Sequence, residues 1–133
     1  MKTALTIAGS DSSSGAGNQS DLKTVSAHRV YGTCAITAVT AQNTLGISVV
    51  HSVPADMVLA QIEAIMEDIT LQAAKTGMLA SRDTVEAVAD CFKRHPKPSL
   101  VVDTIIVSSD GTPLLPGDAV KCLIQKLLPL AAC

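Results

Sequence analysis

Short apolar runs alternate with segments of helical periodicity along the whole chain. Each compact apolar run ends at glycine or at polar residues, which is typical of strands buried within a parallel sheet. The pattern predicts strands over Thr3 to Ala8, Thr33 to Thr40, Ile47 to Val53, Gln72 to Thr76 and Leu100 to Val107. The run from Ile47 alternates apolar with polar residues, so we expect that strand to be short and more exposed.

Four segments repeat their apolar residues at helical spacing. Ser81 is a good N-cap for one of them, basic residues gather at its C-terminal end, and Pro96 stops it. The four helices are predicted from about Gln19 to His28, from Pro54 to about Ile69, from Ser81 to His95, and from a cap at Asp118 to Pro129. The buried faces predicted for them are, in order, Leu22, Val25 and Ala27; Val58, Ile62, Ile65 and Ile69; Val85, Val88, Ala89 and Phe92; and Val120, Leu123, Ile124 and Leu127.

Strands that alternate with helices in this way predict an α/β fold with a mainly parallel sheet and helices on its faces. The 133 residues fit a single domain, residues 1–133. Polar residues follow the predicted strand ends, and ligands of open α/β sheets bind at that edge. These residues are Asp11, Gln42, Gly77 and Ser108 to Asp110. A doubly wound fold returns into another strand after such a last helix, so we expect this chain to be the first half of a larger, truncated fold.

The loop from Gly9 to Gly17 contains four serines and one acid, with glycine at positions 9, 15 and 17. A strand that ends in glycines and opens a helix offers free N–H groups to a ligand. No lysine follows in the position that a Walker loop requires, because Ala16 and Gly17 stand there. Ser20 replaces the third glycine of a dinucleotide fingerprint. Both nucleotide-loop interpretations are therefore weak.

The amino-acid composition argues against nucleic-acid binding and membrane binding. Aromatic residues make up only 2% of the chain and the net charge is −2, so neither a base-stacking platform nor a basic face for nucleic acid or membrane is expected. The four cysteines form no C-x-x-C pair and are interpreted as free thiols. Without a signal-peptide core, the chain is expected in the cytoplasm. His28, His51 and His95 show no ligand spacing and are predicted on the surface, and no metal ligand is assigned.

Several motifs, in order along nearly the whole chain, closely resemble those of hydroxymethylpyrimidine/phosphomethylpyrimidine kinases. This family belongs to the ribokinase-like superfamily, so the resemblance implies a Rossmann-like three-layer fold. The motifs are Ala4 to Ser13, Gly15 to Gly17 with Asp21 to Thr24, Ile36 to Gly46, Lys75 to Ala80, Val101 to Asp103, and Gly111 to Leu115.

The resemblance implies ATP-dependent, Mg²⁺-assisted phosphorylation of 4-amino-5-hydroxymethyl-2-methylpyrimidine and of its monophosphate in thiamine synthesis. The first loop would then form the pyrimidine pocket. There Gln42 can satisfy both donors and acceptors of an aminopyrimidine, and Gly9 lets the backbone approach a flat ring. Asp21 is expected to accept a hydrogen bond from the substrate, or else to be a solvated acid at a helix start. Met78 is expected as a pocket wall or as core.

Two charged residues are expected, through the resemblance, near the nucleotide. Asp103 interrupts an apolar strand, where a buried carboxylate is costly, and is assigned either to the magnesium and phosphates or to a structural hydrogen bond. Lys75 is assigned to phosphate charge, or alternatively extends to solvent from a strand end.

The chain departs from the family pattern at Ser14, where the family has glycine. If the loop needs a positive φ there, serine carries a cost in energy. The family's Gly-Thr-Gly anion hole and the catalytic residue that follows it do not occur in the sequence, so the catalytic residues are expected downstream. We expect these residues to supply the pyrimidine-binding half of the kinase and not to turn over alone.

Two other functions stay open: a non-catalytic relative that binds an aminopyrimidine or a protein partner, and a pyridoxal kinase-like vitamin kinase. Gln42 favours the pyrimidine branch over the second. A homodimer is possible, because a sheet edge left open by truncation favours association.

Overall fold

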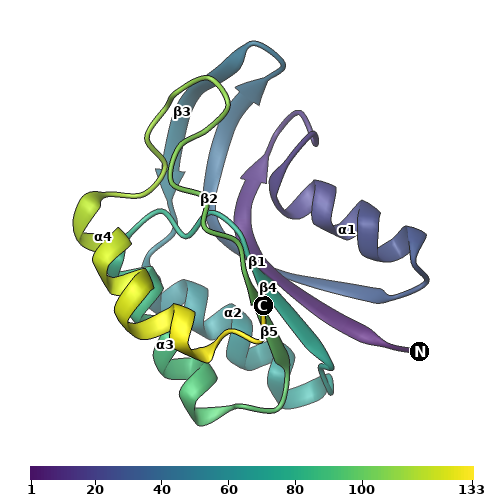
Figure 1. Cartoon of the computed structure of the whole chain (residues 1–133). Coiled ribbons are helices and arrows are strands. Elements are labelled where there is room, and N and C mark those ends of the chain that lie inside the picture. Colours follow the sequence, from purple (N-terminus) through teal and green to yellow (C-terminus); the bar gives the residue numbers. More distant parts are fainter.

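A five-stranded sheet forms the centre of the molecule (Figure 1), in a computed structural model that describes all residues 1–133. The strand order is β3-β2-β1-β4-β5, so β1 lies in the middle. The pairs β1–β2, β1–β4 and β4–β5 are parallel, whereas β3 forms an antiparallel hairpin with β2 at one edge. The strands are β1 (Thr3–Asp11), β2 (Tyr31–Asn43), β3 (Gly46–Ser52), β4 (Ala73–Thr76) and β5 (Ser99–Val102). The mainly parallel α/β sheet predicted from the sequence is confirmed.

Helices cover the two faces of the sheet unequally (Figure 1). The helix α1 packs alone on one face, against β1 and β2. The other helices gather on the opposite face, where they enclose a core of 19 buried apolar residues. The helices are α1 (Gly17–Ala27), α2 (Ala55–Asp68), α3 (Arg82–Arg94) and α4 (Gly117–Cys122), with α4 continuing into the π-helical η1 (Leu123–Leu127) and the 3₁₀ turn η2 (Leu128–Leu130).

The predicted buried face of α1 is only partly buried. Leu22 and Val25 are half-buried, Ala27 is exposed, and Asn18 is the one fully buried residue of this helix. The reason is that a single helix cannot cover the breadth of the sheet. Leu22 and Val25 instead border a shallow apolar cleft that reaches Val101 on β5.

Several strand ends differ from the prediction. Strand β1 runs on to Asp11 because Ser10 and Asp11 still pair with β2, and β2 itself continues to Asn43 in the hairpin with β3. Strand β5 stops at Val102, well before the predicted Val107. Its neighbour β4 ends at Thr76, so no partner strand is left beyond the Asp103 N–H, which donates to the Thr76 carbonyl at 3.1 Å.

The helix boundaries were predicted best at α3. Ser81 is its N-cap and accepts a hydrogen bond from the Thr84 N–H at 3.2 Å. The predicted cap at Asp118 is wrong, because Pro116 precedes the first helical residue and Asp118 lies in the first turn. In the same region Ile124 is 55% exposed and Cys122 is buried instead. The wider π-turn of η1 rotates the following side chains relative to an α-helical face.

The three histidines are exposed, and all four cysteines are free, with Cys91 and Cys122 buried and Cys133 exposed. None of the helices is both long and apolar enough to cross a membrane.

The connection from β1 to α1 depends on glycine at position 17. Gly17 has a φ of +60°, in the left-handed region, and a Cβ placed there would lie 2.3 Å from the Gly9 carbonyl oxygen. That oxygen belongs to the backbone of a central strand and cannot move aside. The start of the helix therefore lies directly against the end of the strand, which no other residue type allows.

We expect Gly17→Ala to lower the free energy of unfolding by about 3 kcal/mol, from left-handed strain and the backbone collision together. Urea unfolding followed by circular dichroism measures this change. The matched control is Gly117→Ala at the start of α4, where a Cβ meets nothing within 4 Å. That variant should unfold within about 0.5 kcal/mol of the parent chain. Equal effects of the two substitutions would contradict the close approach.

Candidate functional site

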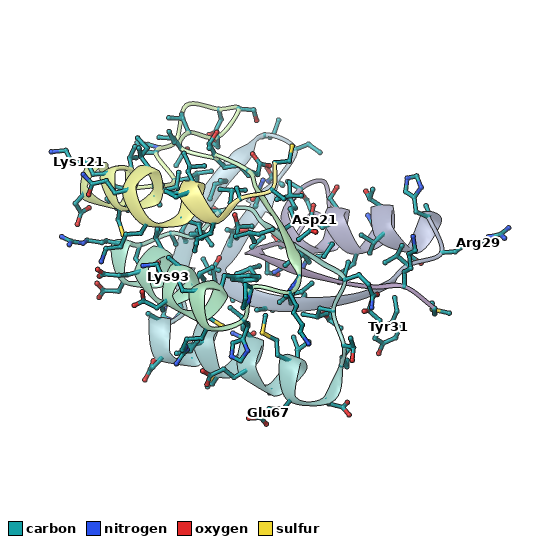
Figure 2. All side chains as sticks on the ribbon, turned by 60° about the horizontal axis from the view of Figure 1, so that its bottom comes forward. Asp21, Arg29, Tyr31, Glu67, Lys93 and Lys121 are labelled. Atoms are coloured by element: carbon teal, nitrogen blue, oxygen red, sulfur yellow. The ribbon has the colours of Figure 1, made fainter.

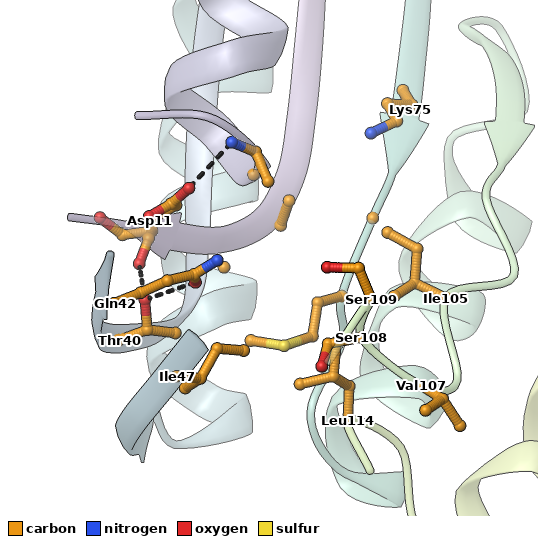
Figure 3. Close-up of a pocket in the computed structure, with 17 residues that line it drawn as sticks. Asp11, Thr40, Gln42, Ile47, Lys75, Ile105, Val107, Ser108, Ser109 and Leu114 are labelled. Atoms are coloured by element: carbon orange, nitrogen blue, oxygen red, sulfur yellow. Dashed lines mark hydrogen bonds between the residues drawn. The ribbon is translucent and has the colours of Figure 1, made fainter. Parts of the chain in front are cut away.

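A cavity of about 240 Å³ lies at the carboxyl ends of β1, β2 and β4 (Figure 3). Its walls come from the end of β1 and the following loop, from the β2–β3 hairpin, from the turn after β4, and from the segment after β5. The lining residues are Ala8, Gly9, Ser10, Asp11, Ala16, Gly17, Thr40, Gln42, Ile47, Lys75, Gly77, Met78, Ile105, Val107, Ser108, Ser109 and Leu114. Polar residues predicted to follow the strand ends do meet at one edge of the sheet.

Four of the six residues singled out from the sequence line this cavity. Gly9, Gln42 and Met78 lie in its walls, and Lys75 lies at its rim. Asp21 and Asp103 are not among the lining residues; Asp21 instead borders the apolar cleft beside α1.

Gly9 and Met78 form one wall together. A Cβ at Gly9 would lie 2.6 Å from Met78 Cε, so the end of the methionine side chain packs directly against the glycine backbone. The Met78 carbonyl accepts a hydrogen bond from the Thr37 hydroxyl at 2.5 Å, which fixes the backbone of this wall. Gly9 and Met78 thus give the cavity a wall without a polar side chain.

Gln42, at the end of β2, brings an amide to the cavity. A register shift between Ala41 and Gln42 in the hairpin redirects the side chains there, as bulges beside binding sites do. The Gln42 backbone is held at both ends, because the Ser12 hydroxyl donates to its carbonyl at 2.6 Å and accepts from its N–H at 2.8 Å. Gln42 Oε1 accepts from the Thr40 hydroxyl at 3.2 Å, and the amide nitrogen faces the cavity (Figure 3).

Asp11 organises the loop after β1. The residue is 3% exposed, and its carboxylate accepts hydrogen bonds at 2.8–3.0 Å from the N–H groups of Ser13, Gly15 and Ala16 and from the Ser13 hydroxyl. Burial opposes ionisation, but the hydrogen bonds together outweigh it and lower the pKa of the Asp11 carboxyl below its usual value. The loop is therefore hydrogen-bonded to the Asp11 carboxylate. The N–H groups of Ser13, Gly15 and Ala16, which a glycine loop would otherwise offer to a phosphate, already donate to it.

Ser14 sits within this loop at a φ of +62°. The expected cost of a serine at this position is therefore real, since residues with a Cβ are disfavoured in the left-handed region. The Ser14 carbonyl accepts from Lys23 Nζ at 3.0 Å, which ties the strained turn to α1.

Asp21 and Lys75 form an ion pair between α1 and β4. Lys75 Nζ lies 3.0 Å and 2.9 Å from the two Asp21 carboxylate oxygens, and the Thr6 hydroxyl donates to the second of these oxygens at 2.6 Å. Asp21 points toward the middle of the molecule, whereas Arg29 and Tyr31 project outward (Figure 2). Both oxygens of Asp21 are engaged by the protein itself.

Asp103 lies near the same pair, with its carboxylate 3.8 Å from Lys75 Nζ. Its expected burial inside a strand is wrong: β5 has already ended, and 46% of the side chain is exposed. The cost of a buried carboxylate therefore does not arise at this position.

The segment after β5 closes the cavity, and sequence patterns did not identify its apolar members. Ile105, Val107 and Leu114 line the wall because residues 106–114 fold back on themselves, with the Leu114 N–H donating to the Ile106 carbonyl at 2.8 Å. Asp110 joins this segment to the hairpin by accepting from the Ile47 N–H at 3.2 Å. Hydrogen bonds from Ser108 and Thr112, followed by the one from Ile47, hold the pKa of Asp110 well below its usual range.

Most N–H and charged groups around the glycine loop and Lys75 are already paired within the protein. No group of three or more His, Cys, Asp or Glu is placed to hold a metal ion. The glycine loop is filled by Asp11, and Lys75 is paired with two carboxylates. We therefore derive no step through ATP or Mg²⁺ from these residues.

Comparison with known proteins identifies the family to which this chain is similar. The model of the phosphomethylpyrimidine kinase family matches residues 11–133. Hydroxymethylpyrimidine/phosphomethylpyrimidine kinases of Haemophilus influenzae and Rhizobium meliloti are 50% and 52% identical over 98% and 96% of this chain. The chain spans 49% and 48% of their lengths, about half of each relative.

Solved structures show the same relationship. A phosphomethylpyrimidine kinase of Clostridium difficile superposes with a TM-score of 0.92 at 45% identity, over 98% of this chain and 57% of that one. A pyridoxal kinase of Bacillus subtilis gives a TM-score of 0.85 at 37% identity, over 98% of this chain and 50% of that one. The fold is that of the ribokinase-like vitamin kinases. Within that class, the chain belongs to the phosphomethylpyrimidine kinase family.

The lowered pKa of Asp11 predicts a pH-dependent contribution to stability. The pKa of Asp11 is lower in the folded state than in the unfolded chain, where it is about 3.9. The stabilisation from ionised Asp11 is therefore fully present above the unfolded-state pKa and is lost as the pH falls through the folded-state pKa. We expect Asp11→Asn to unfold about 1–3 kcal/mol more easily at pH 7, since donors lose their charged acceptor. The difference from the parent chain should shrink below pH 4. Urea unfolding at pH 7, 4 and 3 measures it, and a difference independent of pH would count against an ionised Asp11.

The left-handed Ser14 predicts a stabilising substitution. Ser14→Gly should raise the free energy of unfolding by about 0.5–1 kcal/mol, because glycine adopts this backbone conformation without a Cβ clash. The matched control is Ser13→Gly, which loses a hydroxyl that donates to Asp11 at 2.8 Å and should destabilise. Thermal unfolding of both variants measures the effect; destabilisation by Ser14→Gly would contradict the strain.

Proposed function

We propose that this chain supplies the pyrimidine-binding half of an ATP-dependent kinase that phosphorylates 4-amino-5-hydroxymethyl-2-methylpyrimidine and its monophosphate in thiamine diphosphate synthesis. The observation that carries the proposal is that the Gln42 amide lines the same cavity as the bare Gly9 backbone and the Met78 side chain packed on it. A flat ring fits against the wall of Gly9 and Met78, and an amide pairs with the adjacent amino group and ring nitrogen of an aminopyrimidine. Family membership and the relatives' names support the substrate.

The charged residues extend this proposal to the phosphate. Lys75 lies at the rim of the cavity, and Asp21 and Asp103 hold it there at 2.9 Å and 3.8 Å. We assign Lys75 to the charge of a phosphate at the rim and Asp21 to keeping Lys75 in place. Asp103, which is 46% exposed beside Lys75, is assigned to the phosphate side. Phosphoryl transfer depends on positioning and charge stabilisation, so the nucleotide, Mg²⁺ and the catalytic residue are assigned to the remaining length of the family fold.

The last residues of the chain lie along the outer edge of β5. The Ala132 N–H donates to the Leu100 carbonyl at 2.7 Å, and the Val102 N–H donates to the Cys133 carbonyl at 3.0 Å. We also propose a cytoplasmic location, consistent with four free cysteines.

Calorimetry with the purified chain tests the binding half. We expect 4-amino-5-hydroxymethyl-2-methylpyrimidine to bind, and pyridoxal to bind at least tenfold more weakly, because pyridoxal lacks the amino and ring-nitrogen pair. Tighter binding of pyridoxal would favour the pyridoxal kinase function, which the likeness to the Bacillus subtilis enzyme makes the second candidate. ATP-dependent phosphorylation by this chain alone would refute the assignment of catalysis to the remaining half.

Substitution of Gln42 tests the residue that carries the proposal. Gln42→Ala should weaken binding of the aminopyrimidine about tenfold, since two hydrogen bonds to the ligand are lost. The control is Asn43→Ala, which removes the neighbouring, exposed amide outside the cavity and should leave the dissociation constant within about twofold. Titration calorimetry of both variants and the parent chain measures these affinities. If Gln42→Ala binds the aminopyrimidine as tightly as the parent chain does, Gln42 does not belong to the site.

A further inference from the structure

The start of α1 is completed by a carboxylate that comes from the preceding strand. The helix has no side-chain cap on its first N–H groups and no acidic residue in its first turn. The N–H groups of Gly15 and Ala16, just before the helix, instead donate to one oxygen of Asp11, at 3.0 Å and 2.9 Å. Convergent N–H groups at a helix start are a common site for a bound phosphate or carboxylate. Here the protein provides the anion itself.

Both neighbours of Asp11 in the chain are joined to the cavity. On one side, the Ser12 hydroxyl holds the backbone of Gln42 through its N–H and its carbonyl, at 2.8 Å and 2.6 Å. On the other side, Gln19 accepts from the Asp11 N–H at 3.0 Å and donates to the Ser10 hydroxyl at 2.7 Å. A shift of the loop therefore moves the wall that carries Gln42.

The loop that Asp11 closes is strained. Ser14 is left-handed at a φ of +62°, and its N–H donates to the Asp11 carbonyl at 3.0 Å. A turn with such a residue does not hold its shape by local preference. The buried carboxylate, with four donated hydrogen bonds, is the group that compensates for the strain.

We propose that Asp11 is a positioning residue that acts as a built-in anion, holding the loop so that Ser12 places Gln42 correctly for the ligand. Asp11 acts through Ser12 and the Gln42 backbone rather than by contact with the reacting atoms. The proposal rests on the proposed function for the identity of the ligand, but its effect on the loop can be measured without any ligand.

The test removes the Asp11 carboxylate by substitution and then adds a small carboxylate, formate, to the solution. Asp11→Ala leaves a space lined by four hydrogen-bond donors, and formate is a carboxylate small enough to enter it. We expect the dissociation constant for 4-amino-5-hydroxymethyl-2-methylpyrimidine to rise about tenfold in this variant. Formate at tens of millimolar should restore it to within about threefold of the parent value, whereas chloride at the same ionic strength should not. Weakened binding that formate does not restore would mean a purely structural role and overturn the proposal.

Two further variants keep the test decisive. Asp11→Asn keeps the shape of the side chain but removes its charge, so the affinity for the pyrimidine should fall about tenfold. Formate should not restore that affinity, because the asparagine side chain fills the space. If the alanine variant does not fold, this variant decides: parent-like affinity would overturn the proposal. The control is Asp118→Ala in the first turn of α4. The Asp118 carboxylate accepts one hydrogen bond, from the Ala119 N–H at 2.9 Å, and Asp118 does not line the cavity. Its affinity should not change, with or without formate.

Amide hydrogen exchange separates this proposal from the proposed function. In Asp11→Ala the amides of Ser13, Gly15 and Ala16 should exchange at least tenfold faster than in the parent chain, and formate should slow them again. If the parent chain does not bind the pyrimidine but formate still protects these amides, the proposed function fails while Asp11 retains its role. If the amides exchange equally in both proteins, the role of Asp11 fails whatever the ligand.

Discussion

The close contact between the end of β1 and the start of α1 is the constraint on which the site depends. A Cβ at Gly17 would lie 2.3 Å from the Gly9 carbonyl oxygen, so only glycine permits the contact. The chain between these two points must turn sharply, and the buried carboxylate of Asp11 gathers the N–H groups that the turn exposes. The turn shapes the cavity, because it leaves the Gly9 backbone in its lining and brings Ser12 to the backbone of Gln42, another lining residue.

Three carboxylates near the site have different surroundings and therefore different uses. Asp11 is buried and satisfied by uncharged donors, which makes it a structural anion. Asp21 shares its oxygens between Lys75 and Thr6, so its charge is balanced within the sheet face beside α1. Asp103 is largely open to water and only distantly paired with Lys75. Such an exposed pair contributes little to stability. Of these three, Asp103 is thus the carboxylate most exposed to solvent.

Sequence patterns predicted the order of elements and much of the cavity, because strand ends and helix caps depend on neighbouring residues. Ser81 at the start of α3 and Gln42 at the end of β2 are local signals of this kind. What the sequence did not show depends on partners distant in the chain. Strand β5 ends at Val102 because β4 ends at Thr76, and Leu114 lines the cavity because a later turn folds back on Ile106. The pairing of Asp21 with Lys75 joins residues 54 positions apart, which no local pattern reveals.

The central position of β1 has a consequence for the order in which this protein acquires its structure. The first strand of the chain pairs with β2 on one side and with β4 on the other, so its second edge stays open until Ala73–Thr76 has been synthesised. Parallel pairs between distant segments form slowly, because a long loop must close before any contact is made. During synthesis on the ribosome, β1 therefore keeps an unpaired edge until the residues of β4 have been made. An unpaired strand edge of this kind favours association between chains before the sheet is complete.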